Sequence, residues 1–304
     1  MTLLYWFESI RLPALDAFMS LVTRLGEETF FMAAALFVFW CRDKRRGYYL
    51  LSVGFVGTLV NQWLKIVCRV PRPWVRDPNF TIVESAKEAA GGYSFPSGHT
   101  QSAAGWMGGL ARSSRTWGGR IFWIVLLLLV GVSRMYLGVH TPADVGVSLV
   151  VAAALVFVLY PLIDSTLWFP RRMYLIIGGM MVLSFAFVGF VELYPFPADV
   201  DAANLTSAVG NAYKMAGAVS GMLAVYAFDS RMLQFPTRAP WWGQAVKLTG
   251  GLVFVAAVKM LLKTPLAELC GGHAAADAVR YLIVVLAAGC VWPMTFGFFE
   301  RYAK

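Results

Sequence analysis

Apolar residues form long runs along most of the chain, and short polar segments separate them. A helix needs about 20 apolar residues to cross a bilayer, so runs of this length predict membrane-spanning helices. We expect about nine spans, since the first run is short for a crossing. The runs lie at about residues 28–41, 48–66, 97–111, 121–138, 143–163, 173–193, 205–228, 246–262 and 277–298.

An earlier, shorter segment has a different pattern. Within residues 12–25, apolar side chains recur at helical spacing, whereas Asp16 lies off the stripe. This spacing predicts an amphipathic helix, which we place at the membrane interface together with the rest of residues 1–27. A first membrane-inserted segment is the alternative. The apolar stripe consists of Leu15, Phe18, Met19 and Val22.

Composition supports a chain that is mostly embedded in lipid. Hydrophobic residues make up 59% of it and charged residues 14%, against about 25% charged in ordinary soluble domains. These values exclude a disordered chain, a coiled coil and an ordinary cytosolic enzyme. The net charge of +9 is best explained by contacts with anionic lipid headgroups. We expect no nucleic-acid partner, because the chain has no basic-aromatic module of the known kinds.

The basic residues also predict an orientation. Lysine and arginine are retained in cytoplasmic loops, so we place the basic loop at residues 42–47 in the cytoplasm. The N-terminus then lies outside and the C-terminus lies in the cytoplasm. The segment 65–96 falls outside although it holds five basic residues, which therefore need another explanation.

Three short motifs fall on the same, outer face in this topology. They are Lys65-x6-Arg72-Pro73, Pro96-Ser97-Gly98-His99 and Ser133-Arg134-x5-His140-x3-Asp144. Together they bring three cations, two imidazoles and one carboxylate to one membrane surface. The combination is more informative than any one motif, because each by itself is common.

The cationic and helix-start residues suit a phosphate group. Lys65, Arg72 and Arg134 offer donors for several anionic oxygens, and arginine does so in a bidentate way. Ser97 and Gly98 lie at a predicted helix start, where free backbone N–H groups bind phosphate. Phosphoryl transfer depends mainly on such positioning and charge stabilisation.

The histidines suit the remaining steps. Asp144 lies one turn after His140, close enough to orient its ring, which leaves the other ring nitrogen to attack phosphorus. His99 on the opposite helix can protonate the leaving oxygen as general acid. We therefore predict no metal and no cofactor. The four cysteines lack the spacing of a zinc site, and a pairing of Cys68 with Cys270 stays open.

The three motifs resemble the signature of the type 2 phosphatidic acid phosphatase superfamily, which includes vanadium haloperoxidases and bacterial acid phosphatases. Every signature position is filled, and the resemblance covers about residues 28–165. It implies a phosphohistidine on His140, with His99 as the acid and water releasing phosphate. Lys65, Arg72, Ser97, Gly98 and Arg134 would hold the phosphate. It gives no role to Ser133, which we expect to bond backbone at a helix end.

The remainder of the chain departs from the compact six-span bacterial lipid phosphatases. Residues 166–304 are expected to add four spans to the catalytic core at 28–165. In topology alone, this is similar to glucose-6-phosphatases and sphingosine-1-phosphate phosphatases. Such a likeness does not identify the substrate.

One charged residue lies deep in the seventh run. A charge at that depth costs about 2.5–3.5 kcal/mol and usually faces a cavity or a partner. We therefore place Lys214 in a substrate groove, with Glu192 or Asp277 as its candidate partner, against the alternative that it snorkels to the surface. His273-x3-Asp277 repeats the His140-x3-Asp144 spacing but has no upstream Ser-Arg, so we interpret it as a loop or cap.

These observations predict an all-α, polytopic transmembrane bundle with its active site at the extracytoplasmic end, facing a periplasm, the cell exterior or an organelle lumen. The expected activity is metal-independent hydrolysis of a lipid phosphate monoester or pyrophosphate. Candidate substrates are phosphatidic acid, phosphatidylglycerol phosphate, polyprenyl pyrophosphate and a sphingoid base phosphate. A lipid phosphotransferase, a glucose-6-phosphatase-type enzyme for small soluble esters and a lipid headgroup transporter stay open as alternatives.

Overall fold

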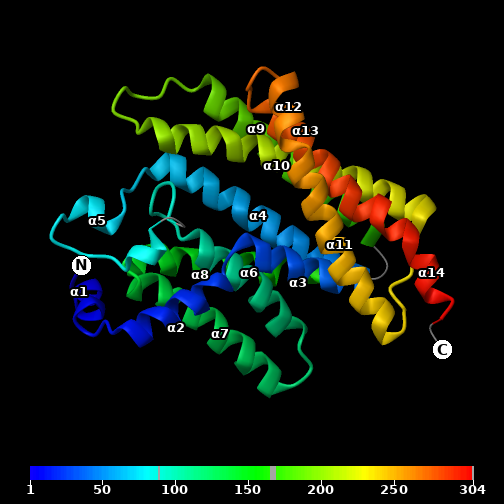
Figure 1. Ribbon diagram of the computed structural model, residues 1–304, viewed down its shortest axis with the longest axis horizontal. Helices are drawn as coiled ribbons and strands as arrows, with labels where there is room; N and C mark the ends of the chain where they lie inside the picture. Colours follow the sequence, from blue (N-terminus) through cyan, green and yellow to red (C-terminus); the bar gives the residue numbers. More distant parts are fainter. Residues whose placement is uncertain (88–89, 165–168, 303–304) are drawn as a thin grey trace. The chain divides into compact units, whose positions relative to one another are not determined.

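The computed structural model describes residues 1–87, 90–164 and 169–302. Within these ranges every regular element is a helix, and no strand is found (Figure 1). This confirms the predicted all-α fold. By contact pattern the chain forms two compact units. The first comprises Met1–Met32, Val56–Pro161 and Val200–Leu205, and the second comprises Ala33–Phe55, Leu162–Asp199 and Thr206–Lys304.

Among the described residues, six helical segments are long and apolar enough to cross a membrane. They are Lys44–Arg76, Trp117–Tyr136, Pro142–Ile163, Pro170–Leu193, Trp241–Leu269 and Ala275–Glu300. The expected count of about nine is therefore not confirmed. Helix α3 (Glu28–Cys41) has 14 residues and α6 (Gly98–Ser113) has 16, and 16 residues extend only about 24 Å. Helix α10 (Ala202–Phe228) is long enough but is not among the six.

The first unit is built around α6, α7 (Trp117–Tyr136) and α8 (Pro142–Asp164). Helices α6 and α7 pack extensively against each other. At Gly131 of α7, an added Cβ would lie 3.0 Å from Cγ1 of Val145 on α8. The small residue therefore lets α7 and α8 approach closely, which brings the end of α7 near the start of α8.

Two N-terminal helices complete this side of the unit. They are α1 (Thr2–Ser9) and α2 (Pro13–Arg24), and α2 packs along α7. Met19 packs on the core and Val22 is buried, as the amphipathic pattern predicts, but Phe18 is 48% exposed. The helix is confirmed, and its position at the membrane interface stays a prediction.

A small apolar cluster supports the loop between α7 and α8. Tyr136, Leu137 and Val139 are buried there against Phe7 of α1. The Tyr136 hydroxyl donates to Asp16 Oδ1 at 2.6 Å. The loop that carries His140 is therefore held on one side by a packed core.

The second unit has its own tightly packed helix pair. At Gly217 of α10, an added Cβ would lie 1.9 Å from the carbonyl oxygen of Ala278, on α13 (Ala275–Leu286). Small residues that allow such close contact are typical of helix pairs in membranes. The other helices of this unit are α9 (Phe169–Leu193), α11 (Trp241–Leu261), α12 (Lys263–Leu269) and α14 (Phe296–Glu300).

Short irregular elements join these helices. The second unit has π-helical turns at Asp229–Leu233 and Ala287–Val291 and a 3₁₀ turn at Trp292–Thr295. In the first unit, α4 (Lys44–Cys68), which begins in the second unit, leads to α5 (Pro73–Arg76) and to a 3₁₀ turn at Glu84–Ala86.

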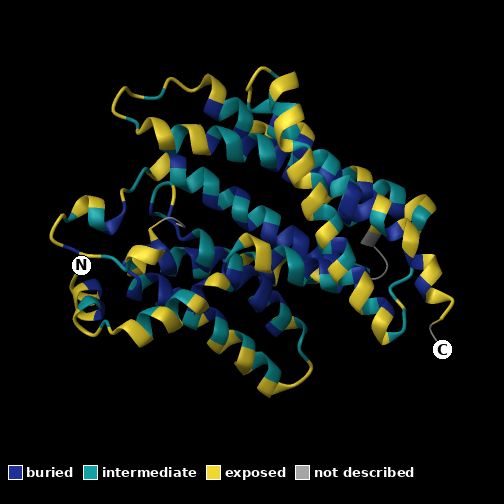
Figure 2. Ribbon diagram, viewed as in Figure 1, coloured by how far each residue is buried: buried dark blue, intermediate teal, exposed yellow. Residues whose placement is uncertain are grey.

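Large apolar side chains are exposed on the outward faces of several long helices (Figure 2). Exposed apolar surface on this scale is unusual for a soluble protein and suits contact with lipid. Among them are Phe122 and Val125 on α7, Val150 and Phe157 on α8, Leu175 and Val182 on α9, and Val253 and Met260 on α11.

Candidate active site

Arg72 connects two loops of the first unit. It precedes α5, and its guanidinium donates to the carbonyl oxygens of Gly91 at 2.7 Å, Gly92 at 3.0 Å and Val139 at 3.0 Å. Lys65, in the last turn of α4, donates to the carbonyl oxygen of Tyr93. Both predicted cations therefore lie against the loop that leads into α6.

Ser97 caps the start of α6 as the sequence predicts. Its Oγ accepts from the hydroxyl of Thr100 at 2.9 Å, and its backbone N–H donates to the carbonyl oxygen of Asp144 at 3.1 Å. The Ser97 N–H is thus already engaged, whereas its hydroxyl oxygen accepts and its own hydrogen can still be donated. The next N–H groups, at Gly98 and His99, belong to the first turn, where the helix itself offers no acceptor.

A serine that the sequence analysis did not single out joins α8 to this helix start. The Ser148 hydroxyl lies 2.8 Å from the carbonyl oxygen of Ser97 and 2.9 Å from that of Asp144. Its position one turn after Asp144, on the same helical face, was the available signal.

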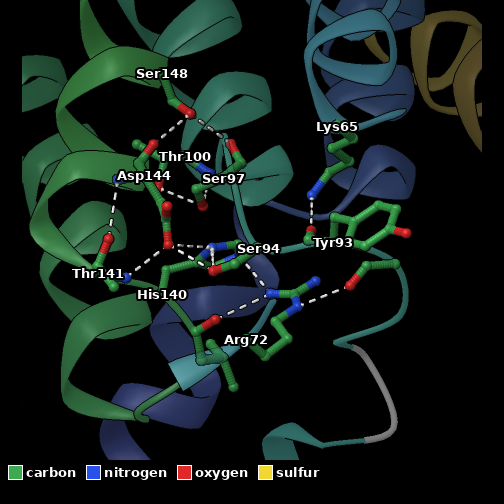
Figure 3. A network of polar contacts seen from close by, with 12 residues as sticks. Lys65, Arg72, Tyr93, Ser94, Ser97, Thr100, His140, Thr141, Asp144 and Ser148 are labelled. Atoms are coloured by element: carbon green, nitrogen blue, oxygen red, sulfur yellow. Dashed lines mark hydrogen bonds and ion pairs between the residues drawn. The ribbon is translucent and has the colours of Figure 1, made fainter. Parts of the chain in front are cut away.

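His140 lies between Arg72 and Asp144 (Figure 3). Its Nε2 is 2.9 Å from Arg72 Nη1, and its Nδ1 is 3.4 Å from Asp144 Oδ2. A guanidinium can only donate, so Nε2 presents its lone pair and the neutral ring carries its proton on Nδ1, facing the carboxylate. This is the tautomer that a nucleophilic Nε2 requires.

The surroundings of His140 favour its neutral form. The residue is 1% exposed. Burial lowers the pKa of the His140 imidazole well below its ordinary value, and the nearby Arg72 lowers it further. Both effects penalise a charged ring.

The Asp144 carboxylate is fixed by two donors besides His140. Its Oδ2 accepts from the backbone N–H of Thr141 at 2.7 Å and from the Ser94 hydroxyl at 2.6 Å. In return, the Asp144 N–H donates to Thr141 Oγ1 at 3.3 Å, which makes a reciprocal cap at the start of α8. Ser94 was missed by sequence reasoning, because nothing in a loop serine marks it as a carboxylate partner.

Arg134 and His99 have buried nitrogen atoms with no hydrogen-bond partner among the described residues. Arg134 is 1% exposed, and its Nη1 donates to Thr23 Oγ1 at 2.7 Å, but its Nε and Nη2 are unpaired. The Nε2 of His99 is unpaired too. Unpaired buried donors are costly and mark places where a further group binds. A phosphate would pair with all of them.

Comparison with known proteins agrees with this geometry. The model of the PAP2 superfamily matches residues 46–168, and the model of the PAP2 superfamily phosphatase transmembrane extension matches residues 213–304. Together the two matches cover more than half of the chain. The chain belongs to the PAP2 superfamily. All three motifs lie within the first match, and the second lies in the part predicted to add spans.

A curated relative of this PAP2 protein is the undecaprenyl-diphosphatase BcrC of Bacillus subtilis (strain 168). It is 29% identical over 154 residues, which cover 49% of this chain and 76% of the relative. No solved structure matches the chain. Family membership and the apolar helices establish an integral membrane protein of a phosphatase family.

The remaining predicted residues have contacts of their own. The Ser133 hydroxyl donates to the carbonyl oxygen of Val130 at 2.7 Å, which is the helix-end contact expected for it. Lys214 belongs to the second unit, where its Nζ lies 3.4 Å from Asn211 Oδ1, and Asp277 pairs with Arg280 at 2.5 Å. A groove role for Lys214 stays a prediction.

The second His-x3-Asp motif and the cysteines have simple surroundings. Nδ1 of His273 accepts from the backbone N–H of Ala275 at 3.1 Å, so it caps the start of α13, as expected. The four cysteines are free thiols, including Cys68 and Cys270.

Proposed function

We propose that this PAP2 protein hydrolyses a lipid phosphate through a phosphohistidine on His140. The observation that carries the proposal is the state of the His140 ring. Its Nε2 lone pair faces Arg72, and its Nδ1 proton faces Asp144. A neutral imidazole oriented by a carboxylate is an activated nucleophile.

In the first step, the phosphoryl group binds between Lys65, Arg72 and Arg134, with the first N–H groups of α6 as further donors. The Arg72 N–H that now contacts Nε2 turns to a phosphate oxygen. Nε2 then attacks phosphorus as the bond to the leaving oxygen breaks, and His99 protonates that oxygen. The unpaired nitrogen atoms of Arg134 and His99 support this assignment.

In the second step, water attacks the phosphohistidine as His99 accepts its proton, and the N–P bond breaks. Asp144 stabilises the cationic ring while it carries the phosphoryl group. Inorganic phosphate leaves and the neutral ring returns. None of these steps needs a metal ion.

We further propose that the site faces the extracytoplasmic side and that the C-terminus is cytoplasmic. The basic loop at 42–47 supports this orientation. The substrate is a lipid phosphate monoester or a diphosphate. The name of the Bacillus relative favours a polyprenyl diphosphate as the second candidate.

Phosphate release by detergent-purified protein, with EDTA present, tests the proposal. We expect wild type to release phosphate from lipid phosphates and His140→Ala to release none. The matched control is His273→Ala, because His273 caps α13 and contacts the ring of Tyr213, both in the second unit, and its loss leaves the site intact. Equal release by wild type and His140→Ala would contradict the proposal.

A further inference from the structure

A cavity of about 330 Å³ lies beside His99 in the first unit. Its lining includes Asn61 of α4, Gln101 and Ser102 of α6, and the consecutive residues Glu27 and Glu28 at the start of α3. Its described lining contains neither His140 nor the cations Lys65, Arg72 and Arg134. The cavity therefore touches the site only through the general acid and the start of its helix.

Three residues that line this cavity have buried polar atoms that lack hydrogen-bond partners among the described residues. Both amide atoms of Asn61, Nε2 of Gln101 and Oγ of Ser102 are in this state. Asn61 is 2% exposed and Gln101 is 4% exposed. Leaving such buried groups unpaired costs about 1–3 kcal/mol each, which indicates that a polar ligand completes them. The space exceeds that of one water molecule, about 30 Å³, by a wide margin.

Two glycines allow this polar wall to form. At Gly57 of α4, an added Cβ would lie 2.8 Å from Gln101 Nε2. At Gly26, before α3, it would lie 2.7 Å from the carbonyl oxygen of His99. Glycine in the middle of a helix costs about 1 kcal/mol relative to alanine, so Gly57 is consistent with a need for the Gln101 amide at this place.

The charge of the cavity limits what can occupy it. Apart from His99, its ionisable lining side chains are Glu27 and Glu28. Glu27 also attracts Arg134 electrostatically. In a diphosphate substrate, the phosphate on the leaving side would meet these two carboxylates and be repelled. Hydroxyl groups of a leaving alcohol would instead find amide and carboxylate partners.

The position of the cavity matches that of the leaving group. In an in-line displacement, the leaving oxygen departs on the side of phosphorus opposite the nucleophile. The general acid must lie within hydrogen-bond reach of that oxygen. A cavity that contains His99 but excludes His140 satisfies both conditions.

We propose that this cavity binds the leaving alcohol and selects a phosphate monoester with a free hydroxyl beside the ester over a diphosphate. This inference rests on the proposed function. As the P–O bond breaks, the leaving oxygen takes the proton of His99, and the neighbouring hydroxyl bonds to Asn61 and Gln101. Glu27 disfavours a leaving group that is itself a phosphate.

Three substrates with the same alkyl chain test the proposal. They are dodecyl glycerol phosphate with a free central hydroxyl, dodecyloxypropyl phosphate, which lacks that hydroxyl, and dodecyl diphosphate. We expect wild type to prefer the first over each of the others by about 10-fold or more in kcat/KM, because a site built to bond a hydroxyl rejects the analogue without it.

Variants assign these preferences to residues. Asn61→Leu and Gln101→Leu should each bring the ratio of kcat/KM with and without the central hydroxyl close to one. Glu27→Gln should raise kcat/KM for the diphosphate, relative to that for dodecyl glycerol phosphate, about 10-fold. Ser184→Ala is the control, because it removes a buried unpaired hydroxyl in the second unit and should change no ratio. Ratios between substrates do not depend on the fraction of folded protein.

The proposal is overturned if wild type prefers the diphosphate or ignores the hydroxyl, or if the cavity variants keep the wild-type ratios. Failure of the proposed function looks different, since wild type would then release no more phosphate than His140→Ala from any substrate. Binding of dodecyl glycerol tests the cavity in that case too. It should raise the thermal unfolding midpoint of wild type and not that of Asn61→Leu, and an equal shift in both would overturn the cavity assignment.

Discussion

Two buried cations, one in each unit, differ in how many hydrogen-bond partners they have. Lys247 of α11 is fully buried, and its Nζ donates to the carbonyl oxygens of Pro236 at 3.2 Å and Thr237 at 3.0 Å. Arg134 of α7 is equally buried, yet two of its three nitrogen atoms have no partner among the described residues. From this difference we infer that the buried charge with protein partners supports the fold, while the one without them binds a ligand.

The same contrast holds for the acidic residues. Asp229 in the second unit pairs with Lys44 at 2.8 Å and accepts from the backbone N–H of Phe235 at 3.3 Å. Asp144 in the first unit holds a neutral histidine and a serine. The first arrangement neutralises a charge within the protein, and the second leaves Asp144 able to stabilise a charge that appears only during a reaction.

The largest expected effect follows from Asp144→Asn. The amide keeps the volume but cannot stabilise the cationic ring or enforce its tautomer, so kcat should fall about 10,000-fold. The measurement is steady-state phosphate release from a lipid phosphate. Asp229→Asn is the matched control and should retain kcat among folded molecules. A fall of less than about 10-fold in Asp144→Asn would show that the carboxylate does not orient the nucleophile.

Arg134→Met comes next. Loss of a donor to the transferring phosphoryl group should lower kcat/KM about 100- to 1,000-fold, with little loss of stability because most of its donors are unpaired in the free protein. Thermal unfolding and phosphate release measured on the same sample separate the two effects. A clear loss of stability with unchanged kcat/KM would contradict the assignment of Arg134 to a ligand, because it would show that Arg134 supports the fold as Lys247 does.

Lys247→Met should give the reverse result. It removes the donor to the carbonyl oxygen of Pro236, whereas that of Thr237 still accepts from Gln244 Nε2 at 2.9 Å. An unpaired buried group costs about 1–3 kcal/mol. We expect a lower unfolding midpoint in detergent and unchanged kcat/KM among folded molecules. A selective loss of activity here would place Lys247 in the reaction instead.

Much of this site could be predicted from the sequence, but its supporting residues could not. The motif residues Arg72, His140 and Asp144 meet because their spacing places each at a helix end on one face. Ser94 and Thr23 contact Asp144 and Arg134 across long sequence separations, which no local pattern encodes. The count of about nine spans is not confirmed, because α3 and α6 are helices of only 14 and 16 residues, about as short as the apolar runs from which they were predicted.

Ser94→Ala has a smaller expected effect. It removes the 2.6 Å hydrogen bond to Asp144 Oδ2, while Thr141 N–H still holds that oxygen. Since a positioning residue of this kind contributes less than the carboxylate itself, we expect kcat to fall about 10-fold, with KM unchanged. Cysteine at this position restores a weak donor and should recover part of the rate. An increase in KM with unchanged kcat would instead assign Ser94 to substrate binding.

The smallest effect concerns pH and stability. The buried His140 has a lowered pKa, so below the ordinary value of 6.5 the unfolded chain binds a proton that the folded chain does not. Stability is therefore fully present above pH 6.5 and should fall as pH decreases, by at most about 1.4 kcal/mol per pH unit. His140→Gln should show a shallower slope in thermal unfolding. Parallel slopes would contradict the neutral assignment of the ring.

The most direct test of the central claim is to trap the covalent intermediate. Wild type is mixed with a lipid that carries radiolabelled phosphate, quenched rapidly in base, and digested for mass spectrometry of the labelled peptide. We expect an acid-labile, base-stable label on His140 that is absent from His140→Ala and present in His273→Ala. Label on another residue, or turnover in wild type with no bound label at any quench time, would contradict it.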